Sequence, residues 1–160
     1  MGLHGSPVEI LTGSEADADE LLAIAGELRD WFTDGAIAAM PVDFHFQGIY
    51  KAVSDGETVG FVSFYVAEAV GHIGWVAVLP GWQGKGVGSA LLRRLEADLV
   101  SRGVGKLRVS TLDDSVDYEP YERTRRFYRA RGFGDFQRIA HPDNPSCPEE
   151  LILQKVLTGP

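Results

Sequence analysis

Apolar and polar residues recur along the chain with spacings that predict strands and helices in turn. Residues 8–11 predict a first strand. A helix follows, with Ser14 as its N-cap and an apolar stripe at helical spacing formed by Leu21, Leu22, Ala25 and Leu28. A second, short helix is expected over 33–40. It should end before Pro41, because the residue that precedes a proline disfavours helical geometry.

The middle of the chain predicts a hairpin, a strand and a long helix. Runs rich in β-branched and aromatic residues flank Asp55-Gly56, a pair typical of tight hairpin turns. Residues 71–80 predict the next strand, bounded by Gly71 and Pro80. The helix after it is expected to end near Gly103, and its apolar face consists of Val87, Leu91, Leu92, Leu95 and Leu99.

The last third predicts a strand at 106–111, a helix that begins near Pro120 and ends near Gly132, and two strands at 133–140 and 151–157. The predicted order is therefore β-α-α-β-β-β-α-β-α-β-β, an α/β (α+β) mixed sheet with helices against it. Because a strand-helix-strand crossover normally makes its two strands parallel, residues 71–111 predict one parallel pair.

Composition narrows the class of protein. The 160 residues fit a single domain, 1–160, with residues 1–6 expected to be disordered, although MGLHGS also matches the loose myristoylation pattern. A net charge of −8 disfavours nucleic acid and anionic membranes as partners. No apolar run reaches the roughly 20 residues of a membrane span. Cys147 is the single cysteine, which excludes an internal disulfide and favours a cytoplasmic location.

Four glycines separate the 71–80 strand from the following helix, at positions 81, 84, 86 and 88. A helix N-terminus after a glycine turn presents backbone N–H groups and a partial positive charge to an anion. The nucleoside-triphosphate loop requires Ser or Thr after its lysine, but Gly86 follows Lys85 here. The dinucleotide fingerprint fails too, because Gly84, Gly86 and Gly88 are one residue short of its spacing.

The spacing that fits is Q-x-x-G-x-G, formed by Gln83, Gly86 and Gly88 after VAVLP. This motif resembles the acetyl-CoA site of the GNAT superfamily of N-acetyltransferases, and the resemblance covers nearly the whole chain. It implies a mostly antiparallel sheet with one central parallel pair and about four flanking helices. The alternative is a glycine-rich turn with a structural role alone, which packs a helix on a strand and binds no ligand.

The resemblance implies a cofactor-binding set and no metal. Backbone N–H groups would hold the pyrophosphate of acetyl-CoA, with Lys85 near a phosphate, and the edge of the preceding strand would bind the pantetheine arm. An exposed loop lysine is the other interpretation of Lys85. The implied residues are Val76, Ala77, Val78, Gln83, Gly84, Lys85, Gly86, Val87, Gly88 and Ser89.

A second motif lies in YERTRRFYRARGF, where Phe127-Tyr128 precedes Gly132-Phe133 at the spacing common in this family. The resemblance assigns Tyr128 as the general acid that protonates the departing CoA thiolate, since a phenol's ordinary pKa of about 10 suits that donation. The alternative is a packed core tyrosine. Where many relatives have asparagine, this chain has Tyr121, which shares a helix face with Tyr128 and is a candidate CoA contact.

The acceptor is expected to be a primary amine of a small molecule, peptide or protein, acetylated by direct transfer in a monomer or homodimer. Acidic residues between the last parallel strand and the tyrosine helix suggest a negative rim that attracts a cationic amine, or else a solvated loop: Asp113, Asp114, Asp117 and Glu119. Five arginines on that helix suggest either CoA attraction or local ion pairs: Arg123, Arg125, Arg126, Arg129 and Arg131.

The general base stays open. Water is one possibility, and the side-chain candidates are Glu68, His72, Asp113, Asp114 and Glu119. An edge-of-strand surface residue is the alternative interpretation of His72. Cys147 lies in a proline-rich loop with no base near it in sequence. The rival function for the whole chain is a non-catalytic domain that binds or senses acyl-CoA.

Overall fold

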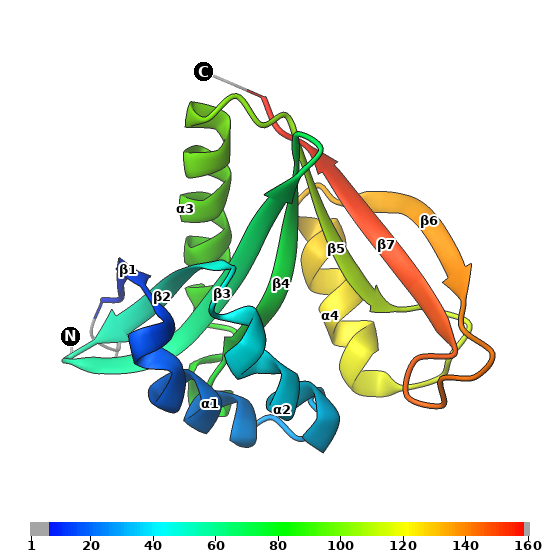
Figure 1. Cartoon of the computed structure of the whole chain (residues 1–160), viewed down its shortest axis with the longest axis horizontal. Helices are drawn as coiled ribbons and strands as arrows, with labels where there is room; N and C mark the ends of the chain where they lie inside the picture. The colour runs from blue at the N-terminus through cyan, green and yellow to red at the C-terminus, as the bar shows by residue number, and fades with distance from the viewer. Residues whose placement is uncertain (1–6, 159–160) are drawn as a thin grey trace. The chain divides into compact units, whose positions relative to one another are not determined.

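The computed structural model describes residues 7–158, and its element order agrees with the predicted one (Figure 1). The MGLHGS pattern lies outside the described residues. The elements are β1 (Glu9–Gly13), a 3-10 turn η1 (Glu15–Asp17), α1 (Ala18–Gly26), α2 (Asp34–Asp43), β2 (Gly48–Ser54), β3 (Glu57–Ala67), β4 (Val70–Val78), η2 (Pro80–Trp82), α3 (Val87–Ser101), β5 (Lys106–Leu112), α4 (Glu119–Ala130), β6 (Gly134–Ala140) and β7 (Glu149–Val156).

The seven strands follow the order β1-β2-β3-β4-β5-β7-β6. Pairing is antiparallel between β1 and β2, β2 and β3, β5 and β7, and β6 and β7, whereas β4 pairs with β5 in parallel. The predicted mostly antiparallel sheet with one parallel pair is therefore confirmed. The chain divides into two compact units, the first with the described residues up to Tyr65 and Gly74–Asp98, the second with Val66–Ile73 and the described residues from Leu99 onward.

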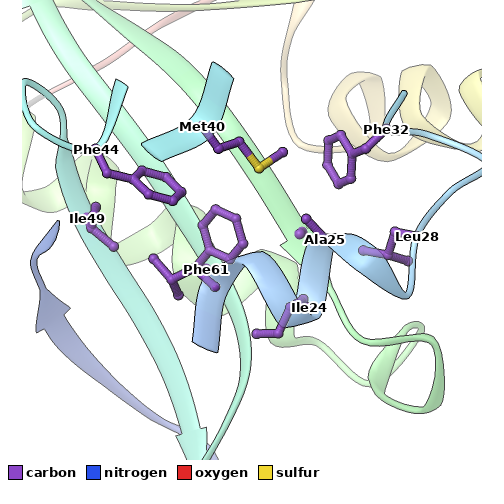
Figure 2. Packing of buried hydrophobic residues seen from close by; sticks show 10 residues of the cluster. Ile24, Ala25, Leu28, Phe32, Met40, Phe44, Ile49 and Phe61 are labelled. Atoms are coloured by element: carbon purple, nitrogen blue, oxygen red, sulfur yellow. The ribbon is translucent and has the colours of Figure 1, made fainter. Parts of the chain in front are cut away.

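The first unit has a core between its helices and strands (Figure 2). Ser14 caps η1 with its side chain in a capping box with Asp17, so the predicted cap is correct although a 3-10 turn precedes the α-helix. The apolar stripe of α1 is buried through Leu21, Ile24 and Ala25. Burial of this stripe stabilises the helix more than its sequence propensity does.

The expectation that the second helix ends before Pro41 is wrong, because α2 continues to Asp43. A proline in the last turn removes one backbone donor, yet the helix closes past it through the Phe44 N–H, which donates to the Met40 carbonyl at 2.9 Å. Met40 and Phe44 are both buried, and the Phe44 ring meets Phe61 edge to face at 5.8 Å. This packing outweighs the local cost of the proline.

Two tight turns shape the strands from β2 to β4. Asp55 and Gly56 have φ values of 49° and 79°, as a two-residue hairpin requires, so the predicted turn is confirmed. Glu68 and Ala69 form the next turn with φ values of 52° and 65°. Neither is glycine, and the sequence therefore carries no signal for this turn.

The predicted apolar face of α3 is buried, with exposures of 2% or less at Val87, Leu91, Leu92, Leu95 and Leu99. Gly103 ends the helix as predicted, with φ 82°, and the Val104 N–H donates to the Leu99 carbonyl.

In the second unit, α4 packs on β5, beside which it lies in Figure 1. The covered face of the strands is apolar and includes Leu107, Val109, Leu151 and Leu153, each 6% exposed or less. Because side chains alternate along a strand, the residues between these leucines and valines belong to the opposite face. In residues 7–158, no helix combines the length and apolarity that crossing a membrane requires.

Candidate active site

The glycine turn joins β4 to α3 through η2 and an exposed loop. Gly84 and Gly86 have φ values of 74° and 84°, a region that side chains with a Cβ rarely adopt. A Cβ built on either glycine meets no atom within 4 Å. The requirement for glycine here is therefore backbone conformation, not space inside the protein.

The first turn of α3 forms an anion-binding geometry. The Ala90 N–H donates to the Gly86 carbonyl at 3.0 Å, which makes Gly86 the residue that opens the helix. The N–H groups of the first helical turn, including those of Val87 and Gly88, have no acceptor inside the helix. Because this turn contains no acidic residue, its partial positive charge is not neutralised locally.

Gln83 braces this loop. Its side-chain amide donates to the Val78 carbonyl at 3.0 Å, and its backbone N–H donates to the Pro80 carbonyl at 3.4 Å. The first bond ties the loop to the end of β4 and already uses the Val78 carbonyl. Contact between Gln83 and a phosphate stays a prediction.

Lys85 is exposed, and its Nζ lies 5.6 Å from the centroid of the Trp82 ring. A phosphate contact by Lys85 stays a prediction. Along β4, Ala77 is buried while Val76 and Val78 are half-buried. A Cβ on Gly60 of β3 would lie 3.0 Å from the Ala77 carbonyl oxygen, so glycine allows close approach at this point. Binding of a pantetheine arm by Val76–Val78 also stays a prediction.

Tyr128 belongs to the second unit, on α4. Its side chain is 1% exposed, and its ring meets Phe127 and Phe133 edge to face at 5.2 Å each. Within residues 7–158, its hydroxyl has no hydrogen-bond partner. Burial raises the pKa of Tyr128, and Tyr121 adds to the effect, so the phenol keeps its proton at neutral pH.

An unpaired buried hydroxyl is costly, about 1–3 kcal/mol. The alternative interpretation was a core tyrosine whose hydroxyl bonds to the protein. Within residues 7–158, Tyr128 does not fit it, because its hydroxyl has no partner there. A packed ring with an unsatisfied hydroxyl points instead to a partner that arrives with a ligand.

Tyr121 lies on the same helix at i−7 and is half-buried. Burial is the main cause that raises the pKa of Tyr121, and the charges of Cys147 and Tyr118 raise it further. Thr124, between the two tyrosines on this face, donates to the Pro120 carbonyl at 3.2 Å. The predicted shared face is therefore present, and CoA contact by Tyr121 stays a prediction.

The arginines of α4 mostly form local ion pairs, as one of the two interpretations predicted. Arg123 pairs with Glu119 at 2.9 Å, and Arg126 with Glu122 at 3.4 Å. Arg125 differs, because it is 5% exposed and donates to the Leu112 carbonyl at 2.6 Å. It ties α4 to the end of β5, a role that its place in a run of arginines did not reveal.

Most acidic residues of the predicted negative rim form ion pairs, and attraction of a cationic amine by this loop stays a prediction. Asp114 accepts from both terminal nitrogens of Arg129, at 3.1 and 3.2 Å. Asp113 is buried and accepts from Arg138 Nε at 3.0 Å. With Glu119 bound to Arg123, three of the four acidic groups are neutralised by arginines distant in sequence or one helical turn away.

These pairings also weaken the predicted base candidates. The Arg129 hydrogen bonds lower the pKa of Asp114, although burial opposes them. Glu68 lies in the turn that precedes β4, at the opposite end of that strand from the glycine loop. His72 is half-buried. Burial is the main cause that lowers its pKa, and the positive charge of Arg108 lowers it further. A neighbouring guanidinium disfavours protonation of an imidazole, because both groups would then be positively charged.

One hydrogen-bonded group was missed by the sequence analysis. Ser110 on β5 donates through Oγ to Glu150 Oε2, and His141 Nε2 lies 2.8 Å from Glu150 Oε1. Ser110 lies 40 residues from Glu150 and His141 lies nine residues from it, and the β5–β7 and β6–β7 pairings bring the three together. The acidic residue directly before the buried Leu151 of β7 was the available signal, but it does not specify which strands flank β7.

The chain belongs to the acetyltransferase (GNAT) family. The model of that family, described as "Acetyltransferase (GNAT) family", matches residues 16–133. This membership indicates acyl transfer as the class of reaction. In residues 7–158, no group of three or more His, Cys, Asp or Glu side chains is placed to hold a metal ion.

Solved structures share the fold at low sequence identity. A GNAT-family acetyltransferase from Desulfovibrio desulfuricans has a TM-score of 0.82 and 21% identity, covering 95% of this chain and 100% of its own. The ribosomal-protein-S18-alanine N-acetyltransferase of Escherichia coli has a TM-score of 0.75 and 18% identity, covering 96% of each chain. The PaiA N-acetyltransferase of Thermoplasma acidophilum, solved with coenzyme A, has a TM-score of 0.71 and 16% identity, covering 94% and 99%.

The unpaired hydroxyl predicts an unusual stability effect. Tyr128→Phe should leave the free energy of unfolding of the ligand-free protein unchanged or raise it, because it removes an unsatisfied polar group. Tyr50→Phe is the matched control, since the buried Tyr50 donates to Asp98. That variant should lose about 1–2 kcal/mol. Urea unfolding measures both, and an equal loss in the two variants would contradict the assignment.

The Asp114–Arg129 pair predicts an acid-dependent loss of stability. Since the folded-state pKa of Asp114 is lowered, its contribution is present above the unfolded-state value near 3.9 and is lost as pH falls through the folded-state pKa. Asp114→Asn should lower stability at pH 7 by about 1 kcal/mol, because the pair is half-exposed, and the gap should close as pH falls through the lowered folded-state pKa. Urea unfolding of the wild type and of Asp114→Asn across pH measures the gap, and a gap that stays constant as pH falls would contradict the assignment.

Proposed function

We propose that the protein is an N-acetyltransferase that moves an acetyl group from acetyl-CoA to a primary amine by direct transfer. Family membership supports acyl transfer, and the unpaired, buried hydroxyl of Tyr128 is the observation that carries the mechanism. Acetyl-CoA supplies an activated thioester, and no metal takes part in the proposed reaction.

The glycine turn would bind the diphosphate. The N–H groups of Val87 and Gly88 suit phosphate oxygens, and the positive end of the α3 dipole favours their charge. Gly84 and Gly86 supply the left-handed backbone that opens the turn, and Gln83 fixes the loop on β4. Lys85 and Tyr121 are proposed as further contacts.

Tyr128 would act as the general acid. A leaving thiolate needs a proton, and a protonated phenol held away from water is a donor whose hydrogen bond is strong in a low-dielectric site. Its raised pKa ensures that the proton is present before the reaction. The free hydroxyl also needs no internal bond to be broken before it turns to the sulfur.

The class of acceptor amine is inferred from structural neighbours, because no residue of this chain identifies it. Among the structural neighbours, one is named as an N-acetyltransferase of a ribosomal protein's alanine and another as a PaiA N-acetyltransferase. We therefore propose a peptide, protein or small-molecule amine as acceptor. A non-catalytic domain that binds or senses acyl-CoA is the alternative, because it would use the same loop without turnover.

The loop assignment predicts a matched pair of glycine variants. Gly86→Ala should weaken coenzyme A binding about tenfold, since a residue with a Cβ at φ 84° costs about 1–2 kcal/mol and shifts the turn. Gly81→Ala is the control, because Gly81 is not among the glycines of positive φ and a Cβ there meets open space. Isothermal titration calorimetry measures both, and equal affinities would contradict the loop assignment.

Turnover separates the enzyme from the sensor. With acetyl-CoA and a panel of spermidine, tyramine and an alanine-initiated hexapeptide, the wild-type protein should release thiol with at least one amine. Tyr128→Phe should lower kcat by about 10²–10⁴ and leave coenzyme A affinity within threefold. Tyr50→Phe should show the opposite behaviour, with reduced stability and unchanged kcat. Coenzyme A binding without thiol release from the wild type would favour the sensor.

A further inference from the structure

Side chains hold both ends of the segment Val76–Val78 of β4, which is called the arm-binding segment below. At its far end, the Gln83 side-chain amide donates to the Val78 carbonyl at 3.0 Å. Directly before its near end, the backbone N–H of Trp75 donates to Ser63 Oγ of β3 at 2.9 Å. Since backbone carbonyls are the usual acceptors in a strand ladder, the Ser63 hydroxyl takes over a backbone role at this point.

Gln47 fixes the direction of the Ser63 hydroxyl. Ser63 is 0% exposed, and its hydroxyl donates to Gln47 Oε1 at 2.6 Å. A hydroxyl has one proton, so the oxygen of Ser63 presents only lone pairs to the Trp75 N–H. The two side chains therefore form a short series of hydrogen bonds that ends on the backbone of β4.

Glycine at position 74 makes room for the Gln47 amide. A Cβ built on Gly74 would lie 2.1 Å from Gln47 Oε1 and 2.7 Å from Gln47 Cδ. A larger residue here would push the amide away from Ser63. The amide therefore lies directly against the β4 backbone, one residue before the N–H that Ser63 binds.

The side chain of Trp75 is held as well. Its Nε1–H donates to Asp43 Oδ2 of α2 at 2.8 Å, and its ring meets Phe32 edge to face at 6.0 Å. Trp75 is thus tied through its backbone and its indole, immediately before the arm-binding segment. A strand segment that is already ordered loses less conformational freedom when a ligand binds, which favours affinity.

We propose that Ser63 and Gln47 are positioning residues that place the arm-binding segment for the pantetheine arm of acetyl-CoA; this rests on the proposed function. Neither side chain contacts the ligand in this proposal. Their effect passes through the Trp75 backbone to Val76, and a shift of about 1 Å is enough to spoil the alignment of bound groups. The diphosphate is assigned to the first turn of α3, so loss of Ser63 should affect binding of the arm and spare the diphosphate.

Calorimetric titration of the full-length protein with two ligands tests this assignment. One is coenzyme A, and the other is 3′-phosphoadenosine 5′-diphosphate, which is coenzyme A without its pantetheine arm. The wild type should bind coenzyme A at least about tenfold more tightly, because only coenzyme A has the arm that binds β4. Ser63→Ala should weaken coenzyme A binding about tenfold and leave the armless nucleotide within about threefold of the wild type.

Three further variants serve as comparisons, and urea unfolding checks that each is folded. Gln47→Leu should weaken coenzyme A binding by only about threefold, because Ser63 Oγ can still accept the Trp75 N–H. Ser54→Ala is the matched control and should leave both affinities unchanged, since Ser54 is another buried serine of the same unit, 4% exposed on β2. Gly86→Ala should weaken both ligands alike, because it alters the proposed diphosphate loop.

The proposal is overturned if Ser63→Ala keeps the wild-type affinity for coenzyme A, or if it weakens both ligands to the same extent, as a purely structural role would. Equal binding of the two ligands by the wild type would also overturn it, because β4 would then contribute nothing to binding of the arm. Failure of the proposed enzyme is distinct: a coenzyme A sensor would show the predicted affinities and release no thiol with any amine of the panel.

Discussion

A buried hydroxyl without a hydrogen-bond partner is the constraint on which the functional account depends. Tyr128 is packed between two phenylalanine rings, and in the described part of the chain its oxygen bonds to nothing. Such a group costs about 1–3 kcal/mol, whereas phenylalanine fills the same space without that cost. Selection for stability alone would remove the oxygen. Its presence is explained if the hydroxyl gains a partner only when a ligand binds.

The polar side chains on and around α4 form bonds of their own. Polar side chains of α4 and of the loop before it bond elsewhere: Thr124 bonds to Pro120, Arg125 to Leu112, and Asp114 to Arg129. None of these bonds involves the phenol of Tyr128. Several arginines of α4 therefore serve the local structure, as the ion-pair interpretation of the positive run predicted.

Local patterns predicted the features whose cause is local. The glycine turn, the buried face of α3 and the Asp55-Gly56 hairpin depend on residues near one another in sequence, and the structure has all three. Pro41 and the Glu68-Ala69 turn were missed because packing and strand pairing override the local preference there. The helix around Pro41 persists because Met40 and Phe44 are buried on either side of it.

The site was predictable only in part, for a related reason. Tyr128 and the glycine turn carry motifs of fixed spacing, but the state of a hydroxyl depends on which neighbours reach it. The Asp113–Arg138 and Ser110–Glu150 pairings depend on strand register between segments 25 and 40 residues apart, and the second brings Ser110 to the carboxylate that His141 also contacts. Acidic residues that looked like a free rim were therefore neutralised, and a histidine in an unremarkable loop gained a carboxylate partner.

A crystal structure of the protein with coenzyme A tests the central claim most directly. The account predicts that the diphosphate accepts hydrogen bonds from the N–H groups of Val87 and Gly88, and that the Tyr128 hydroxyl donates to the thiol sulfur. A ligand bound elsewhere, or a Tyr128 hydroxyl that remains unpaired with coenzyme A in place, would contradict it.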